Sequence, residues 1–115
     1  MILEILSSMI LLSGTASYYS TTGCLGCNKE MIMANGKKLN DSALTIAMSP
    51  KMVRKYKLLN KYVLIKNPTS GKEINVKVTD TGGFEKYNRV ADLTIATRDA
   101  LKCKNLCEVE IKIKL

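Results

Sequence analysis

Residues 74–83 read INVKVTDTGG, and this stretch carries the clearest structural signal in the chain. Apolar residues at 74, 76 and 78 alternate with polar ones, which is the pattern of a β-strand with one buried face. Asp80 follows the strand directly, and the pair Gly82 and Gly83 allows a positive φ or a close approach of the backbone to a ligand. The stretch therefore predicts a strand that leads to a carboxylate and a glycine-lined turn.

Short strands are also predicted on both sides of this stretch. Residues 62–65 form the first arm of a hairpin whose loop is 67–71. Upstream, residues 14–19 and 31–34 read as strands, and the second runs into the turn signal Asn35-Gly36. The C-terminal strand is predicted to direct four side chains into the core: Val109, Ile111, Ile113 and Leu115. The fold class that follows is mostly β.

Two short helices are expected to interrupt the strands. Ser49 is a typical N-cap residue and Pro50 is a typical first helical residue, which predicts a helix over 51–56. Thr94 is the second expected cap, and it precedes a helix over 95–101.

The length and composition indicate one globular domain. The chain has 115 residues, of which 46% are hydrophobic and 24% are charged, enough for one core but not for two. We place the domain at 14–115 and interpret the apolar segment 1–13 as the remnant of a secretory signal or as a first strand. The apolar segment is too short and too interrupted to span a bilayer, so we expect no transmembrane segment. We also expect a monomer.

The net charge of +8 points to an anionic partner or an anionic surface. The basic residues are spread over several segments, which favours a solvated basic surface over a dedicated patch. One Phe and no Trp leave little to stack on bases, and the chain contains no nucleic-acid-binding motif. We therefore expect no nucleic-acid partner. Binding of nucleic acid or another anionic polymer by charge alone remains an alternative function.

The residues available for chemistry are restricted because the chain contains no histidine, the commonest general base and metal ligand. Four cysteines form two close pairs, Cys24 with Cys27 and Cys103 with Cys107. Such pairs suit either disulfides in a small exported domain or an all-cysteine zinc site. We favour disulfides, without choosing among the possible pairings, and we expect neither a metal nor a cofactor.

Two carboxylates are candidates for catalysis. Asp80 ends the strand quoted above, and Asp92 lies among apolar residues just ahead of the second helix cap. An acidic side chain with apolar neighbours tends to have a raised pKa, which suits a general acid. Asp80 could equally start a turn, and Asp92 could stabilise the N-terminus of the helix.

Five segments resemble the rare lipoprotein A-like double-psi β-barrel, a relative of expansin and barwin domains. The sequence GTASYY at 14–19 is similar to the G-x-A-S-x-Y strand of that family, and ANG at 34–36 is similar to its A-N-G turn. LTIA at 44–47 resembles L-T-A-A, DTGGF at 80–84 resembles D-R-G-P-F, and RVADLT at 89–94 resembles R-x-x-D-L-S. The five segments occur in the order of the family.

The resemblance implies a six-stranded double-psi β-barrel with two short helices and a groove that holds a glycan strand. It implies a secreted or cell-envelope protein whose partner is a cell-wall polysaccharide of the peptidoglycan type. Asp80 and Asp92 would be the carboxylates of the groove. Six further residues would contact the glycan: Ser17, Tyr19, Thr45, Thr81, Gly82 and Gly83.

Whether the chain cleaves the glycan is left open by the resemblance. Family members that cleave are lytic transglycosylases, in which the 6-hydroxyl of muramic acid attacks its own anomeric carbon and one acid/base carboxylate suffices. Four positions depart from the pattern of those enzymes: Lys37, Met48, Thr81 and Gly83. These departures favour a wall-binding or wall-loosening protein of the expansin kind. The alternative is an active lytic transglycosylase that uses Asp92 or Asp80 as its general acid/base.

Overall fold

A computed structural model describes residues 2–6, 8–23, 30–83 and 88–115. Two helices lie in this part of the chain, α1 (Pro50–Tyr56) and α2 (Ile95–Ala100). The strands of the same part are β1 (Ile2–Leu6), β2 (Met9–Tyr18), β3 (Thr45–Met48), β4 (Tyr62–Asn67), β5 (Lys72–Thr81), β6 (Arg89–Leu93) and β7 (Cys107–Lys114).

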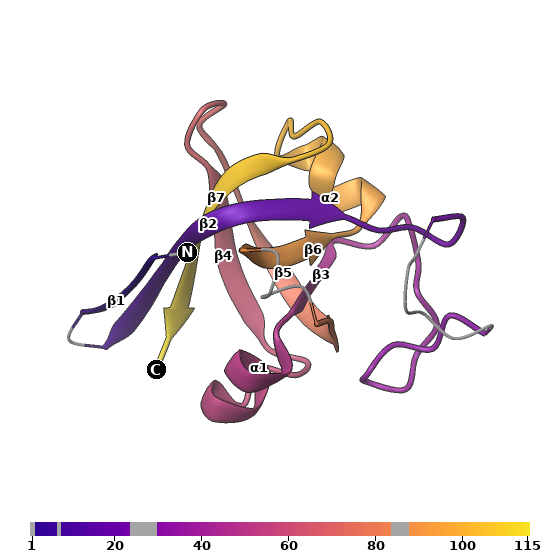
Figure 1. The fold of residues 1–115 in the computed structure, drawn as a ribbon, viewed down its shortest axis with the longest axis horizontal. Coiled ribbons are helices and arrows are strands. Elements are labelled where there is room, and N and C mark those ends of the chain that lie inside the picture. Colours follow the sequence, from indigo (N-terminus) through magenta and orange to yellow (C-terminus); the bar gives the residue numbers. More distant parts are fainter. Residues whose placement is uncertain (1, 7, 24–29, 84–87) are drawn as a thin grey trace.

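Six of the described strands close into a barrel (Figure 1). Their order is β2-β6-β3-β5-β4-β7, and β7 pairs with β2 to complete the circle. The pairs β2–β6 and β3–β5 are parallel, whereas the other pairs in the barrel are antiparallel. The expected fold class, mostly β with a six-stranded barrel and two short helices, is confirmed. β1 is an extra strand that pairs with β2 outside the barrel.

The barrel interior is filled by the alternating apolar residues of the strands. On β2 the inward residues are Ile10 and Leu12, and on β5 they are Val76 and Val78, all at most 1% exposed. The prediction for the C-terminal strand is confirmed for its first three apolar residues, which are also buried: Val109, Ile111 and Ile113. Leu115 was expected in the core as well, and this prediction is wrong. It is 64% exposed because β7 ends at Lys114, before the alternation reaches it.

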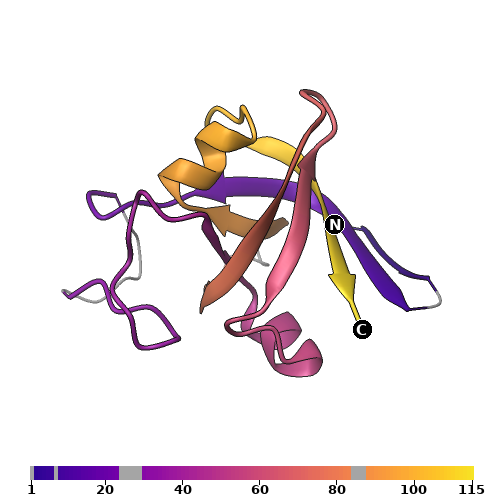
Figure 2. The same cartoon turned by 180° about the vertical axis from the view of Figure 1, so that it is seen from behind.

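Both helices begin at the caps that the sequence predicts. The Met52 amide donates to the Ser49 hydroxyl at 3.2 Å, and the Thr97 amide donates to the Thr94 hydroxyl at 3.3 Å. α1 and α2 lie at opposite ends of the barrel (Figures 1 and 2). In the described residues neither helix is long and apolar enough to cross a membrane.

The segment 31–39 is a compact loop on the side of the barrel, where a strand was expected over 31–34. The segment contributes one isolated bridge, between Ile32 and Lys38, and then turns at Asn35-Gly36. Gly36 has a φ of +86°, which explains the glycine at the turn. Met33 and Leu39 from this loop form a second, smaller apolar cluster with Tyr19 and Ala47. The loop therefore covers part of the outer wall of the barrel.

Candidate functional site

A register shift in the parallel pair β3–β5 determines where Asp80 points. Ile46 on β3 is opposite Val78, but the next residue, Ala47, is opposite Asp80, so β5 contains one extra residue. In a regular strand Asp80 would share the inward face with Val78. The β-bulge instead moves Asp80 to the outer face of the wall, beside Ala47.

A second register shift, in the parallel pair β2–β6, has the same consequence for Asp92. Thr15 is opposite Arg89, whereas Ala16 is opposite Ala91, so β6 contains one extra residue. Arg89 and Asp92 are three positions apart and would lie on opposite faces of a regular strand. The bulge places both on the outer face, and Asp92 then lies opposite Ser17.

The two shifts bring four residues into one row across the outer wall. Ser17 of β2 is opposite Asp92 of β6, Asp92 is opposite Ala47 of β3, and Ala47 is opposite Asp80 of β5. Neighbouring strands are about 4.8 Å apart, so the backbones of Asp92 and Asp80 are about 10 Å apart. The row thus contains both candidate carboxylates and one expected glycan contact, Ser17.

Asp92 is partly withdrawn from water. The Ser17 hydroxyl donates a hydrogen bond to Asp92 Oδ1, and Arg89 Nη1 donates to the Ser17 oxygen at 3.4 Å. Burial raises the pKa of Asp92 above its ordinary value, and the nearby charge of Asp80 adds to that effect. The hydrogen bond from Ser17 and the charge of Arg89 oppose the rise in pKa without cancelling it. Asp92 is therefore protonated more readily than an ordinary aspartate.

Asp80 accepts hydrogen bonds on both carboxylate oxygens. The amides of Ala34 and Thr81 each donate to Oδ1 at 2.9 Å, and the Tyr19 hydroxyl donates to Oδ2 at 3.3 Å. Ala34 belongs to the loop 31–39, so Asp80 connects that loop to the end of β5. Asp80 acts as a structural anchor as well as a member of the row.

Tyr19 lies between the two carboxylates. Its side chain is 6% exposed and packs in the small cluster over Ala47. Burial raises the pKa of Tyr19, as do the charge of Asp80 and the hydrogen bond to it, and the charge of Asp92 contributes in the same direction. The Tyr19 hydroxyl therefore remains a proton donor at physiological pH.

Thr45 and the residues after Asp80 surround this row. Thr45 Oγ1 is buried and has no hydrogen-bond partner among the described residues. Thr45 shares a face of β3 with Ala47, so its hydroxyl lies on the side of the row. Thr81 ends β5 opposite Met48, and the Gly82 amide donates to the Met48 carbonyl at 3.2 Å.

Gly83 is exposed, and an added Cβ would meet no atom within 4 Å. The positive φ considered for Gly82 and Gly83 is not observed, because the described glycines with positive φ are Gly36 and Gly71.

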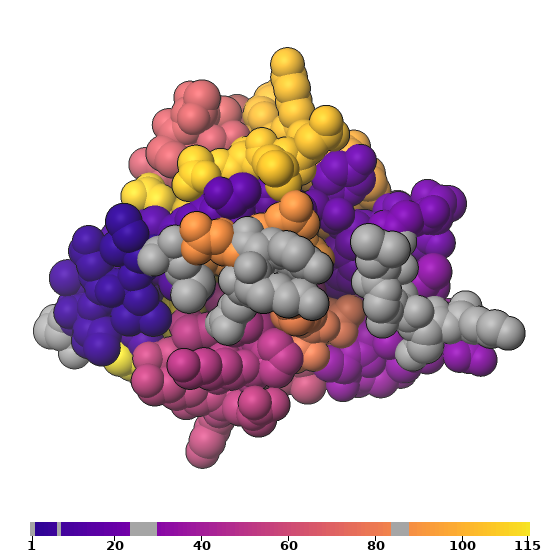
Figure 3. All heavy atoms as spheres, viewed as in Figure 1, coloured from indigo at the N-terminus to yellow at the C-terminus, as the bar shows by residue number. Residues whose placement is uncertain are grey.

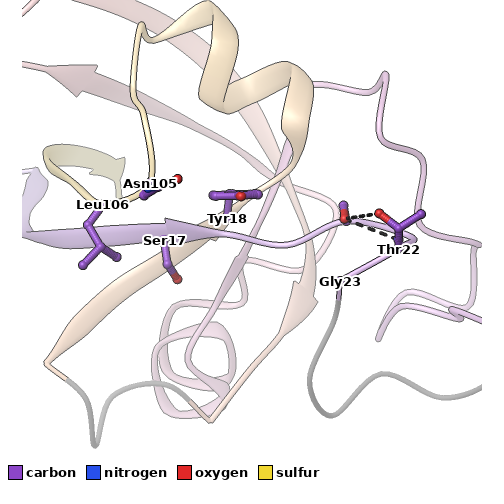
Figure 4. Close-up of a pocket in the computed structure, with 7 residues that line it drawn as sticks. Ser17, Tyr18, Thr22, Gly23, Asn105 and Leu106 are labelled. Atoms are coloured by element: carbon purple, nitrogen blue, oxygen red, sulfur yellow. Dashed lines mark hydrogen bonds between the residues drawn. The ribbon is translucent and has the colours of Figure 1, made fainter.

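A cleft of about 500 Å³ opens beside the Ser17 end of the row (Figure 4). We call it the Ser17 cleft, and its lining residues are Ser17, Tyr18, Ser20, Thr22, Gly23, Asn105 and Leu106. Tyr19 and Thr45 do not line it, although both belong to the surroundings of the row. The described part of the lining offers hydroxyls, an amide, an aromatic ring and an aliphatic side chain, and it contains no ionised group.

Exposed basic side chains are also found on α1 and β7. α1 carries exposed basic side chains at Lys51, Arg54 and Lys55, and it forms the lower edge of the face drawn in Figure 3. β7 carries Lys112 and Lys114 on the outside of the barrel, where Lys112 Nζ is 3.6 Å from a carboxylate oxygen of Glu73. These basic side chains on α1 and β7 do not line the Ser17 cleft, whereas Arg89 and Arg98 contact its lining residues Ser17 and Tyr18.

Cys103 and Cys107 form a disulfide, which confirms the disulfide expectation for that pair. The disulfide also rules out a zinc site made of four cysteine thiolates, since a bonded pair has no thiolates to give. Cys24 and Cys27 lie outside the described residues. Among the residues described, no group of three His, Cys, Asp or Glu side chains is placed to hold a metal ion.

Several residues of the site were not singled out from the sequence. Arg89 lies in the RVADLT motif, but the sequence alone gave no reason to direct it towards Ser17. Ala34 contributes through its backbone amide, so its side chain gives no indication of this role. Asn105 and Leu106 lie in a segment that matches no motif. The pair Cys103 and Cys107 on either side was the only sequence feature that could have indicated a fixed loop there.

Comparison with solved structures identifies the architecture. An expansin from Clavibacter michiganensis matches with a TM-score of 0.61 and 18% identity over 91% of this chain, which spans half of the length (50%) of that expansin. A Streptomyces papain inhibitor matches with a TM-score of 0.61 and 17% identity over 90% of this chain and 94% of the inhibitor. No protein-family model and no curated protein matches the sequence. The chain has a double-psi β-barrel fold related to that of expansin-like domains.

Proposed function

We propose that this barrel binds a cell-wall polysaccharide of the peptidoglycan type along the row from Ser17 to Asp80. The observation that carries the proposal is the position of Asp92. It is a half-buried carboxyl group with a raised pKa, held by Ser17 at the edge of an uncharged cleft. Binding sites combine a concave surface with a few converging polar groups, and perturbed titratable groups are common in them.

The fold alone does not choose this function, because one fold carries many functions. The two solved structures named above are an expansin and a papain inhibitor, and this chain resembles both to the same extent. The local chemistry favours a glycan. Hydroxyls, an amide and an aromatic ring complement the hydroxyl groups and the C–H faces of sugar rings.

The charge distribution favours a glycan over a polyanion at this site. A polyanion would be held by Lys and Arg side chains, and the described residues that line the Ser17 cleft include neither. The disulfide between Cys103 and Cys107 is typical of an oxidising compartment. We therefore place the protein outside the cytoplasm, secreted or in the cell envelope, where wall polysaccharide is found.

A second candidate function, cleavage of the glycan as a lytic transglycosylase, is favoured by the raised pKa of Asp92. In this reaction protonated Asp92 donates its proton to the glycosidic oxygen of the leaving sugar as the bond to the anomeric carbon breaks. The 6-hydroxyl of the muramic acid forms a new bond to that carbon and passes its proton to the Asp92 carboxylate. The reaction gives a 1,6-anhydro sugar and restores the protonated acid, and it requires neither water nor a nucleophilic side chain.

The binding proposal is tested by sedimentation with purified peptidoglycan sacculi over a range of salt concentrations. Wild-type protein should sediment with the sacculi nearly independently of salt, because the described lining of the cleft carries no ionised side chain. Asp92→Asn should weaken binding by about tenfold, a value that corresponds to one hydrogen bond to a charged group. Glu4→Gln removes the same charge from an exposed position on β1 and should leave binding unchanged. Binding that disappears at moderate salt, with Asp92→Asn equal to wild type, would contradict the proposal in favour of binding by charge alone.

A further inference from the structure

The loop between Cys103 and Cys107 is fixed at both of its ends. The Cys103 amide donates to the Arg98 carbonyl at 3.0 Å at the end of α2, and the Cys103 side chain is 9% exposed. Cys107 begins β7 opposite Ala16, one residue before Ser17. The disulfide joins these two fixed ends across three residues. The tip of the loop, Asn105 and Leu106, is therefore held next to the end of β2, as Figure 4 shows.

Tyr18 forms another part of the wall of the Ser17 cleft, and its ring is also held in place. The guanidinium carbon of Arg98 lies 4.3 Å from the centre of the Tyr18 ring, a cation–π arrangement. Arg98 is in turn fixed by a hydrogen bond from its Nε to Asp99 at 3.1 Å. Tyr18 is 37% exposed, so part of the ring remains available to a ligand. An aromatic surface fixed in this way loses little conformational freedom on binding.

The tip of the loop presents an amide side chain next to an apolar one. Asn105 offers one amide oxygen and two amide hydrogens, which can pair with another amide in both directions. Leu106 is 55% exposed and provides an apolar surface beside it. An acetamido group needs both features, because it has an amide to pair and a methyl group to cover. A plain hydroxyl at the same position would use neither fully.

We propose that Tyr18 and the loop 103–107 form a subsite for one uncharged sugar that bears an acetamido group, and that Asn105 and Leu106 recognise that group. The subsite adjoins Asp92, because Ser17 lines the cleft and donates its hydroxyl hydrogen to the Asp92 carboxylate. The inference rests on the proposed glycan function and adds the identity of the sugar and the residues that select it.

The experiment measures the affinity of the protein for three soluble tetrasaccharides that differ at one substituent per ring. They are β-1,4-linked oligomers of N-acetylglucosamine, glucose and glucosamine. Wild-type protein should bind the acetamido oligomer about tenfold more tightly than the glucose oligomer, which corresponds to one hydrogen bond and one apolar contact. The cationic glucosamine oligomer should bind no better than the glucose oligomer.

Variants at the loop tip test whether Asn105 and Leu106 cause the preference for the acetamido oligomer. Asn105→Ala and Leu106→Ser should each reduce the ratio of the two affinities, acetamido over glucose, to about threefold or less. Lys104→Ala changes an exposed residue of the same loop that does not line the cleft, and it should leave the ratio unchanged. Thermal unfolding checks that each variant is folded, and both substitutions should be tolerated because both residues are exposed. A variant that weakens binding of both oligomers equally leaves the ratio of the two affinities unchanged.

The outcomes separate this inference from the function on which it rests. An unchanged ratio in both tip variants, with sacculus binding still dependent on Asp92, would overturn the subsite and leave the glycan function intact. Equal affinity of wild type for the acetamido and glucose oligomers would do the same. No binding to sacculi or to any oligosaccharide would overturn both. A reduced ratio in the tip variants, with Lys104→Ala equal to wild type, supports the subsite.

Discussion

Asp80 at the end of β5 and Asp92 at the end of β6 lie on the same outer wall of the barrel, but their surroundings differ. Asp80 accepts hydrogen bonds from two backbone amides and from Tyr19. Asp92 accepts a hydrogen bond from the Ser17 hydroxyl and is buried enough for its pKa to be raised. Both carboxylates reach their positions through a β-bulge in a parallel strand pair.

The difference between the two ends separates anchoring from proton transfer. A carboxylate tied to backbone amides fixes a loop, and its replacement is expected to disturb the structure. A desolvated carboxyl group beside one hydroxyl contributes less to the structure and is better suited to exchange a proton. Both aspartates lie near the end of a strand, yet we expect Asp80 to matter more for stability and Asp92 more for function.

The largest expected effect concerns the release of anhydro sugars from peptidoglycan, if the second candidate function holds. Asp92→Asn preserves the shape of the side chain and removes its exchangeable proton, so the rate should fall by about 10²–10⁴-fold. Asp80→Asn should lower the rate less, because it retains an oxygen that accepts hydrogen bonds. Mass spectrometry of the soluble products measures both rates. A greater loss for Asp80→Asn would reverse the assigned roles.

The next largest effect is on the free energy of unfolding. Asp80→Ala removes the acceptor of three hydrogen bonds and releases the loop 31–39, so stability should fall by about 2 kcal/mol. Asp99→Ala is the matched control, because Asp99 has a side chain that is 61% exposed and should cost less than about 0.5 kcal/mol. Urea denaturation followed by circular dichroism measures both values. Equal stability of the two variants would show that Asp80 does not anchor the loop.

A smaller effect is expected at the residue between the carboxylates. Tyr19→Phe keeps the buried ring over Ala47 and removes only the hydroxyl that donates to Asp80. The free energy of unfolding should fall by about 1 kcal/mol, the usual contribution of one hydrogen bond. The same urea titration gives the answer. A loss above about 3 kcal/mol would mean that the ring, and not the hydroxyl, had been displaced.

The smallest effect concerns the pH dependence of stability. The folded-state pKa of Asp92 is raised above the ordinary value of 3.8, so ionising this group as the pH rises lowers the stability of the wild type. Asp92→Asn lacks this penalty and should melt about 2 °C above wild type at pH 7. The gap should close as the pH falls below the ordinary value of 3.8, where the carboxyl group becomes protonated in both the folded and the unfolded state. A gap that widens on acidification would mean that the pKa of Asp92 is lowered by folding.

The alternation of apolar residues and the helix caps were sufficient for the mostly β class and for both helices, whereas the closed barrel was expected only from the family resemblance. Ser49 and Thr94 are caps in the structure. The alternation of β5 and β7 correctly predicts the buried apolar side chains of these strands, but it wrongly adds Leu115. The loop 31–39 was misjudged because an apolar run of four residues does not distinguish a strand from a loop that covers a small cluster. Local periodicity contains no information about such tertiary packing.

The candidate site could be predicted only in part. Asp80 and Asp92 were recognisable from their neighbours, but simple alternation would have directed Asp80 inwards, beside Val78. The bulges that redirect both carboxylates are properties of strand pairing, which depends on residues far apart in the chain. For the same reason the contribution of Asn105 and Leu106 became visible only when β7 was seen beside β2.

Chemical-shift mapping of the labelled protein with a soluble peptidoglycan fragment tests the central claim most directly. We predict that the largest shifts in backbone amide resonances occur at Ser17, Asp92 and Asn105, and that they persist at high salt. Amides of the exposed basic residues on α1 and β7 should shift little. The largest shifts on α1 and β7, lost as salt is added, would contradict a glycan site at the Ser17 cleft.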